Sequence, residues 1–221
     1  MKIQIRKGLF ETNSSSTHSV TVALDNDKSV SHFDPYHDIL KSDIPDVESL
    51  KVDSEDNMVH VCFGEFGWED TAFNNPYDKL SYVLTMVYET EYESNEDKYD
   101  FYNYDKEKFI KDFAELTGFK NLNEAVKSEC NCDGIYIASD VRIVRYSNTP
   151  FLEVDGYIDH QSGRDLYSSF NNFLDEYGLT THDYLFDKNV VVITTNDNRY
   201  VSYDSKYDSR HISQLIKLQR K

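Results

Sequence analysis

Short segments with two different hydrophobic periods are interspersed along the 221 residues of this chain, and their order is the main constraint on its fold. Apolar and polar residues alternate over 18–24 and 151–160, which is the period of a half-buried strand. Apolar residues recur every three or four positions over 163–178, which is the period of an amphipathic helix. No regular strand–helix–strand repeat is present. The pattern therefore predicts an α+β fold with a mixed or mostly antiparallel sheet and helices packed on one side.

Several expected elements carry local signals at their ends. Asn75, followed by proline, is typical of a helix N-terminus. Asp105 is expected to cap a second helix that ends at Gly118. Thr180 and Asp183 form a capping-box pattern before a short helix. The other expected strands are 2–6, 57–64, 134–139, 141–146, 189–194 and 199–203.

The chain is long enough to bury one good hydrophobic core. It contains no internal repeat and no linker rich in proline, glycine or serine. We therefore expect residues 1–221 to form a single α+β domain. Residues 65–128 are expected to be a helical and acidic insertion between strands.

The formal net charge of −17 excludes a general nucleic-acid binder, because binding to phosphate needs positive charge at the contact surface. The charge fits a protein that binds a basic surface on a protein partner, or one that is acidic for solubility. No stretch has the ~18 to 20 apolar residues that span a bilayer, and the N-terminus lacks the apolar core of a secretory signal. The odd number of cysteines suits a reducing cytoplasm.

A hydroxyl-rich loop, ETNSSSTHS, occupies residues 11–19. Hydroxyl groups beside a strand can hold phosphate oxygens, or supply a nucleophile where a base lies within reach. The alternative is a turn in which these side chains satisfy backbone groups locally. The candidate phosphate-binding or substrate-binding residues are Asn13, Ser14, Ser15, Ser16 and the more distant Ser162.

Two histidines are predicted at the ends of apolar strand faces, His18 at the start of one strand and His160 at the end of another. If the two ends meet at one edge of the core, Glu11 and Asp159 would complete a site for general acid–base chemistry or for a divalent metal. The alternative is a pair of buried structural histidines bonded to the backbone. One face of the strand 151–160 is predicted to carry Glu153, Asp155, Tyr157 and Asp159. The opposite face is predicted to carry Val154, Gly156, Ile158 and His160.

His60 and Cys62 form one pair of soft metal ligands, and Cys130 and Cys132 form another. Zinc sites more often have a two-residue gap within each pair and a knuckle turn. Small apolar packing is the favoured interpretation of these cysteines, so we predict no metal site.

The tract 88–105, YETEYESNEDKYDFYNYD, interleaves carboxylates with aromatic rings. Such a surface can imitate the charge and stacking of nucleic acid and occupy a basic groove on another protein. The alternative is a solvated loop. The candidate partner-binding residues are Glu91, Tyr92, Glu93, Glu96 and Asp97.

Three segments carry a resemblance: RKGLFETNSSSTHS at 6–19, IDHQS at 158–162 and LFDKNVVVITTNDN at 185–198. The chain resembles a group of bacteriophage and prophage proteins, especially of Gram-positive and gut bacteria, which share the motifs R-x-G-x-F-E-T-N-S-S-S-x-H-S and I-D-H-Q-S. The third segment departs from the group, since LFDKN stands in place of F-L-F-x-x-N. The resemblance implies a phage origin and a location in the host cytoplasm, and it brings no activity or cofactor with it.

These observations lead to three functional hypotheses. The first is a phage accessory protein for host takeover or anti-defence, in the manner of an anti-CRISPR inhibitor, which binds a host protein through an acidic surface. The second is a small enzyme for a phosphate-containing or nucleotide-like substrate, with His18 or His160 as base and Glu11 or Asp159 orienting it. The third is a structural module without a site. The sequence predicts no particular cofactor and no oligomeric state.

Overall fold

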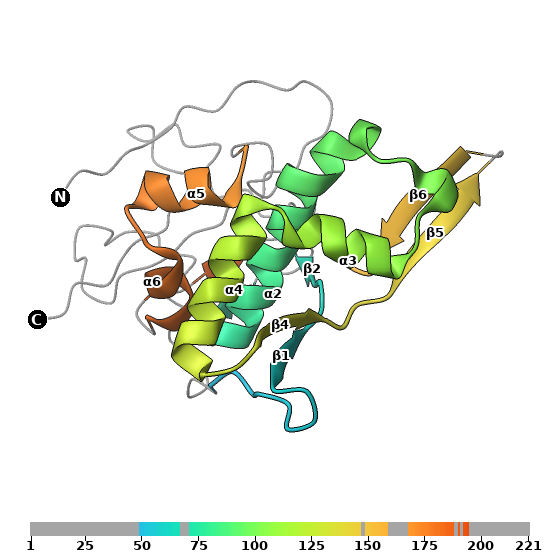
Figure 1. Ribbon diagram of the computed structural model, residues 1–221. Coiled ribbons are helices and arrows are strands. Elements are labelled where there is room, and N and C mark those ends of the chain that lie inside the picture. The colour runs from blue at the N-terminus through green and yellow to red at the C-terminus, as the bar shows by residue number, and fades with distance from the viewer. Residues whose placement is uncertain are drawn as a thin grey trace, which may run out of the picture.

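The computed structural model describes residues 49–66, 71–146, 149–158, 168–187, 190 and 192–194, and within them strands and helices are interspersed (Figure 1). The predicted α+β class is confirmed. The strands are β1 (Met58–Val61), β2 (Glu65–Phe66), β3 (Thr71–Phe73), β4 (Gly134–Ile137), β5 (Val141–Tyr146), β6 (Thr149–Val154), β7 (Tyr157–Ile158) and β8 (Val192–Thr194). The α-helices are α2 (Pro76–Val87), α3 (Lys106–Ala114), α4 (Thr117–Cys130), α5 (Phe170–Tyr177) and α6 (Thr181–Phe186).

The described strands pair two by two. β1 pairs with β4 and β2 pairs with β7 in parallel, whereas β3 pairs with β8 and β5 pairs with β6 in antiparallel orientation. This combination agrees with the predicted mixed character. The β5–β6 hairpin extends away from α4, α5 and α6 (Figure 1).

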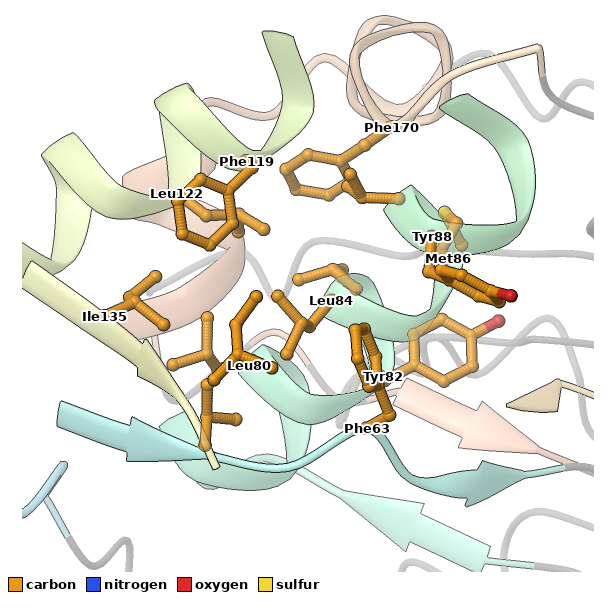
Figure 2. Packing of buried hydrophobic residues seen from close by; sticks show 14 of the residues in the cluster. Phe63, Leu80, Tyr82, Leu84, Met86, Tyr88, Phe119, Leu122, Ile135 and Phe170 are labelled. Carbon is orange, nitrogen blue, oxygen red and sulfur yellow. The ribbon is translucent and has the colours of Figure 1, made fainter. Parts of the chain in front are cut away.

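Helix α2 lies at the centre of the described core. The side chain of Asn75 caps it by accepting the N–H of Asp78 at 2.8 Å, as the cap and the following proline predict. Every residue from Lys79 to Val87 is buried, so the helix is covered on all sides rather than along a single stripe. Its side chains meet those of β1, β4, α4 and α5 (Figure 2). The predicted insertion therefore supplies the central helix.

Gly118 does not end a helix as predicted. The preceding helix α3 stops at Ala114, and Gly118 lies in the first turn of α4. A Cβ atom at Gly118 would stand 2.5 Å from Oε1 of Glu91, so this position needs glycine for a close contact rather than for a helix stop. The other end signals hold: Asp105 caps α3 and Thr180 forms the predicted capping box with α6.

No helix in the part of the chain that the structure describes is both long enough and apolar enough to cross a membrane.

Candidate functional site

The acidic tract 88–105 is folded into the body of the protein at its start, whereas Tyr102 near its end is 64% exposed. It forms a π-helix, η1 (Tyr88–Tyr92), followed by two 3-10 helices, η2 (Glu93–Lys98) and η3 (Phe101–Asn103). Tyr92 is only 1% exposed; its ring stacks on Tyr99 with centroids 4.4 Å apart. The assignment of Tyr92 as a partner-binding residue is therefore wrong, because its ring is packed inside the molecule.

A chain of hydrogen bonds links the buried tyrosine hydroxyl groups to the surface. The hydroxyl of Tyr92 bonds to that of Tyr104, which donates to Oδ2 of Asp112 at 2.8 Å. The ammonium group of Lys108 donates to the same oxygen at 2.8 Å. Burial, followed by the hydrogen bond with Tyr92, raises the pKa of Tyr104. Burial would also raise the pKa of Asp112, but the bonds from Lys108 and Tyr104 outweigh it and lower that pKa.

Two glutamates of the π-helix bind backbone N–H groups from other parts of the chain. Glu89 is 4% exposed, and its Oε1 accepts the N–H of Ile158 at 2.7 Å. Glu91 accepts the N–H of Gly118 at 3.0 Å and that of Phe170 at 3.4 Å. The Glu91 carboxylate, predicted to bind a partner, thus joins the first turns of α4 and α5. The other predicted acidic contacts, Glu93, Glu96 and Asp97, lie on η2, and their role stays a prediction.

A polar hollow of about 410 Å³ lies beside Glu91. Its other lining residues are Thr90, Asn95, Glu115, Leu116, Thr117, Ser168, Ser169 and Asn171. A pair of helix N-termini would normally attract an anion. Here Glu91 accepts their N–H groups, so its own carboxylate fills the place that such an anion would take.

The predicted histidine and hydroxyl site lies outside the described residues. This applies to all of its members, so the site stays a prediction: Glu11, Asn13, Ser14, Ser15, Ser16, His18, Asp159, His160 and Ser162.

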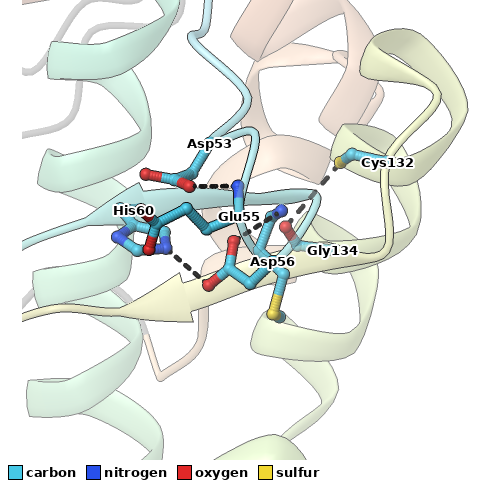
Figure 3. Close-up of polar contacts among 7 residues, drawn as sticks. Asp53, Glu55, Asp56, His60, Cys132 and Gly134 are labelled. Carbon is cyan, nitrogen blue, oxygen red and sulfur yellow. Dashed lines mark hydrogen bonds and ion pairs between the residues drawn. The ribbon is translucent and has the colours of Figure 1, made fainter.

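The four soft ligands considered for zinc are not assembled into a site. All three cysteines belong to the described residues, and no group of three or more His, Cys, Asp or Glu there could hold a metal ion. Nε2 of His60 lies 2.7 Å from Oδ2 of Asp56, and the Cys132 thiol bonds to the carbonyl of Gly134 at 3.7 Å (Figure 3). Met58 pairs with Gly134 at the start of β4, and Val61 pairs with Ile137 at its end. Cys62, which follows Val61, therefore lies at the far end of β4, whereas Cys132 lies before its start.

The segment 151–158, predicted as part of one strand, is divided into β6 and β7, which are separated by Asp155 and by Gly156 at φ 144°. Exposure still alternates along it: Phe151, Glu153, Asp155 and Tyr157 are exposed, whereas Val154 is half-buried and Ile158 is buried. The rings of Phe151 and Tyr157 are 39% and 37% exposed, less than that of Tyr102 at 64%.

Neighbouring strands add further charges beside these side chains. Arg142 lies opposite Glu153 with the charged groups 3.7 Å apart, and its Nε lies 4.0 Å from Asp140. Glu65 pairs with Tyr157 in the β2–β7 register. We use the name acidic-aromatic face for the exposed residues of these paired segments: Glu65, Asp140, Arg142, Phe151, Glu153, Asp155 and Tyr157. Glu65, Asp140 and Arg142 were not predicted, since they are brought to this segment by backbone pairing between distant parts of the chain.

No protein-family model, curated protein or solved structure matches this chain.

Proposed function

We propose that this chain is a phage accessory protein that acts in the host cytoplasm by binding a host protein through a carboxylate-rich surface. Its partner would carry a basic face, such as the nucleic-acid groove of a defence nuclease, which the acidic surface would occupy. The net charge of −17 and the resemblance of the 6–19 and 158–162 segments to phage proteins support this function.

The observation that carries the proposal is the exposure of aromatic rings beside carboxylates on the acidic-aromatic face. Phe151 and Tyr157 are more than one-third exposed, although most rings of the described residues are packed in the core. Aromatic side chains are enriched at protein interfaces, and exposed carboxylates attract a basic partner during encounter. This supports a partner surface on β6 and β7, while the burial of Tyr92 argues against a contact through the η1 part of the tract 88–105.

Binding of the full-length chain to synthetic peptides tests the proposal. An arginine-rich peptide and a glutamate-rich peptide of the same length are titrated by calorimetry at low and at physiological ionic strength. We expect the arginine-rich peptide to bind and its affinity to fall as salt screens the charges, while the glutamate-rich peptide does not bind. Equal binding of the two peptides, or no binding of either, would contradict the proposal.

A further inference from the structure

We propose that the acidic-aromatic face is the contact surface for an arginine-containing segment of another protein. This inference rests on the proposed function and adds to it the place of contact and the side chain that the contact recognises. It is drawn from the charge balance, the exposed rings and the backbone geometry of β5, β6 and β7.

The charges of the face are unbalanced in favour of a cationic partner. The carboxylates of Glu65, Asp140, Glu153 and Asp155 outnumber the guanidinium group of Arg142 and the nearby ammonium group of Lys106, which donates to the carbonyl of Ser139, next to Asp140, at 2.9 Å. Arg142 is 62% exposed and meets Glu153 at 3.7 Å and Asp140 at 4.0 Å. Exposed ion pairs of this length are weak, so Glu153 is available to an incoming arginine while Arg142 stays beside Asp140.

The exposed rings favour arginine over lysine. Phe151 and Glu153 are two residues apart on the same side of β6, and the exposed Asp155 and Tyr157 follow across the break between β6 and β7. A planar guanidinium group stacks on an aromatic ring and forms paired hydrogen bonds with a carboxylate, whereas an ammonium group is more strongly hydrated. A surface on which an exposed ring stands beside a carboxylate therefore suits arginine side chains.

The backbone holds the face in place before a partner arrives. Gly156 has φ of 144°, and a Cβ atom there would lie 2.5 Å from Cβ of Phe63. The N–H of Tyr157 also donates to the carbonyl of Gly64 at 2.9 Å. The strand is thus fastened against the segment that follows β1, and a preordered surface binds at a lower entropic cost.

The test compares variants of the full-length chain in titrations with an arginine-rich peptide and its lysine counterpart. Glu153→Gln with Asp155→Asn removes two charges from the face. Glu115→Gln with Glu124→Gln removes two charges elsewhere; Glu124 is a match for Glu153 because a basic group, that of Lys127, also lies 3.7 Å from its carboxylate. We expect the face variant to lose roughly three- to tenfold in affinity and the control less than twofold.

A second variant tests the rings. Phe151→Ala with Tyr157→Ala is expected to lower the affinity for the arginine peptide by roughly fivefold and to remove its advantage over the lysine peptide. Circular dichroism and thermal melts confirm that each variant is folded. Equal losses in the face and control variants, or an unchanged preference for arginine in the ring variant, would overturn the inference even if the wild-type chain binds basic peptides. If the wild-type chain binds neither basic peptide, the proposed function itself fails.

Discussion

The tract 88–105 and the segment 151–157 both interleave aromatic rings with carboxylates, yet the fold buries the rings of η1, at the start of the tract, and leaves Phe151 and Tyr157 exposed. Tyr92 is 1% exposed and lies against other rings, whereas Tyr157 is 37% exposed. The carboxylate of the half-buried Glu91 binds backbone N–H groups of two helices, whereas among the described residues that of Glu153 is paired with an exposed arginine. Similar composition therefore produces a structural element in one place and a candidate binding surface in the other.

The difference follows from the local backbone period. In the helical tract, Tyr88 and Tyr92 are four residues apart and stack on the same side, towards Phe109. In the extended segment, exposure alternates from residue to residue, so Phe151 in β6 and Tyr157 in β7 are exposed to solvent while Ile158 fills the core.

Truncation of one ring in each region should give the largest contrast. Tyr92→Ala removes a buried ring that stacks on Tyr99 and meets Phe109 at 5.1 Å, and it should lower the free energy of unfolding by ~3–5 kcal/mol. Tyr157→Ala should lower it by less, ~1–2 kcal/mol, because more than a third of the residue is exposed to solvent. Urea denaturation of both variants measures the difference. Similar losses would show that both rings are structural.

A buried and an exposed basic residue should also differ in their effect on how stability depends on pH. Lys79 is fully buried, its ammonium group donates to the carbonyl of Asp187 at 2.9 Å, and burial lowers its pKa to about 7, opposed by the charge of Asp187. Above pH 7 the unfolded chain retains a proton that the folded chain releases, so stability rises with pH. Between pH 7 and 9 the gain should reach ~2–3 kcal/mol.

Chemical denaturation of two variants across this pH range shows which residue causes the rise in stability. Lys79→Met should remove the rise in stability, while Arg142→Met, which replaces a base that is 62% exposed, should leave it unchanged. A rise that persists in Lys79→Met would mean that another group is responsible.

The smallest expected difference in stability is between variants of Glu91 and of Glu153. Glu91→Ala leaves the N–H groups of Gly118 and Phe170 without their acceptor and should cost ~1–2 kcal/mol. Glu91→Gln should restore part of this, because its amide oxygen can still accept one bond. Glu153→Ala should cost less than ~0.5 kcal/mol, since only an exposed ion pair is lost. Thermal melts compare the three, and a cost for Glu153→Ala equal to that for Glu91→Ala would remove the distinction.

Several parts of the fold could be predicted because their causes are local. The Asn75 cap and the Thr180 capping box depend on hydrogen bonds to residues three positions away. The exposure of Phe151 and Glu153 depends on alternation along β6. The candidate face was only half predictable, because Arg142 and Glu65 reach it through strand pairing.

The mistaken predictions concern residues whose role is set by distant partners. Gly118 looked like a helix stop, and its reason for being glycine is the carboxylate of Glu91, which is far from it in sequence. Tyr92 looked like a surface residue because its neighbours in sequence are acidic. Its surroundings in the fold are Tyr99, Tyr104 and Phe109.

The sequence by itself determined the α+β class, the helix caps, the alternating faces of the strand and the acidic charge. Only the tertiary structure decided which rings are buried, which carboxylates bind the backbone and which charges share the acidic-aromatic face. The physical reason is that caps and periods act over a few residues, whereas burial and charge pairing depend on segments brought together by packing. The pairing of β5 with β6 and the contact between Glu91 and Gly118 are such events.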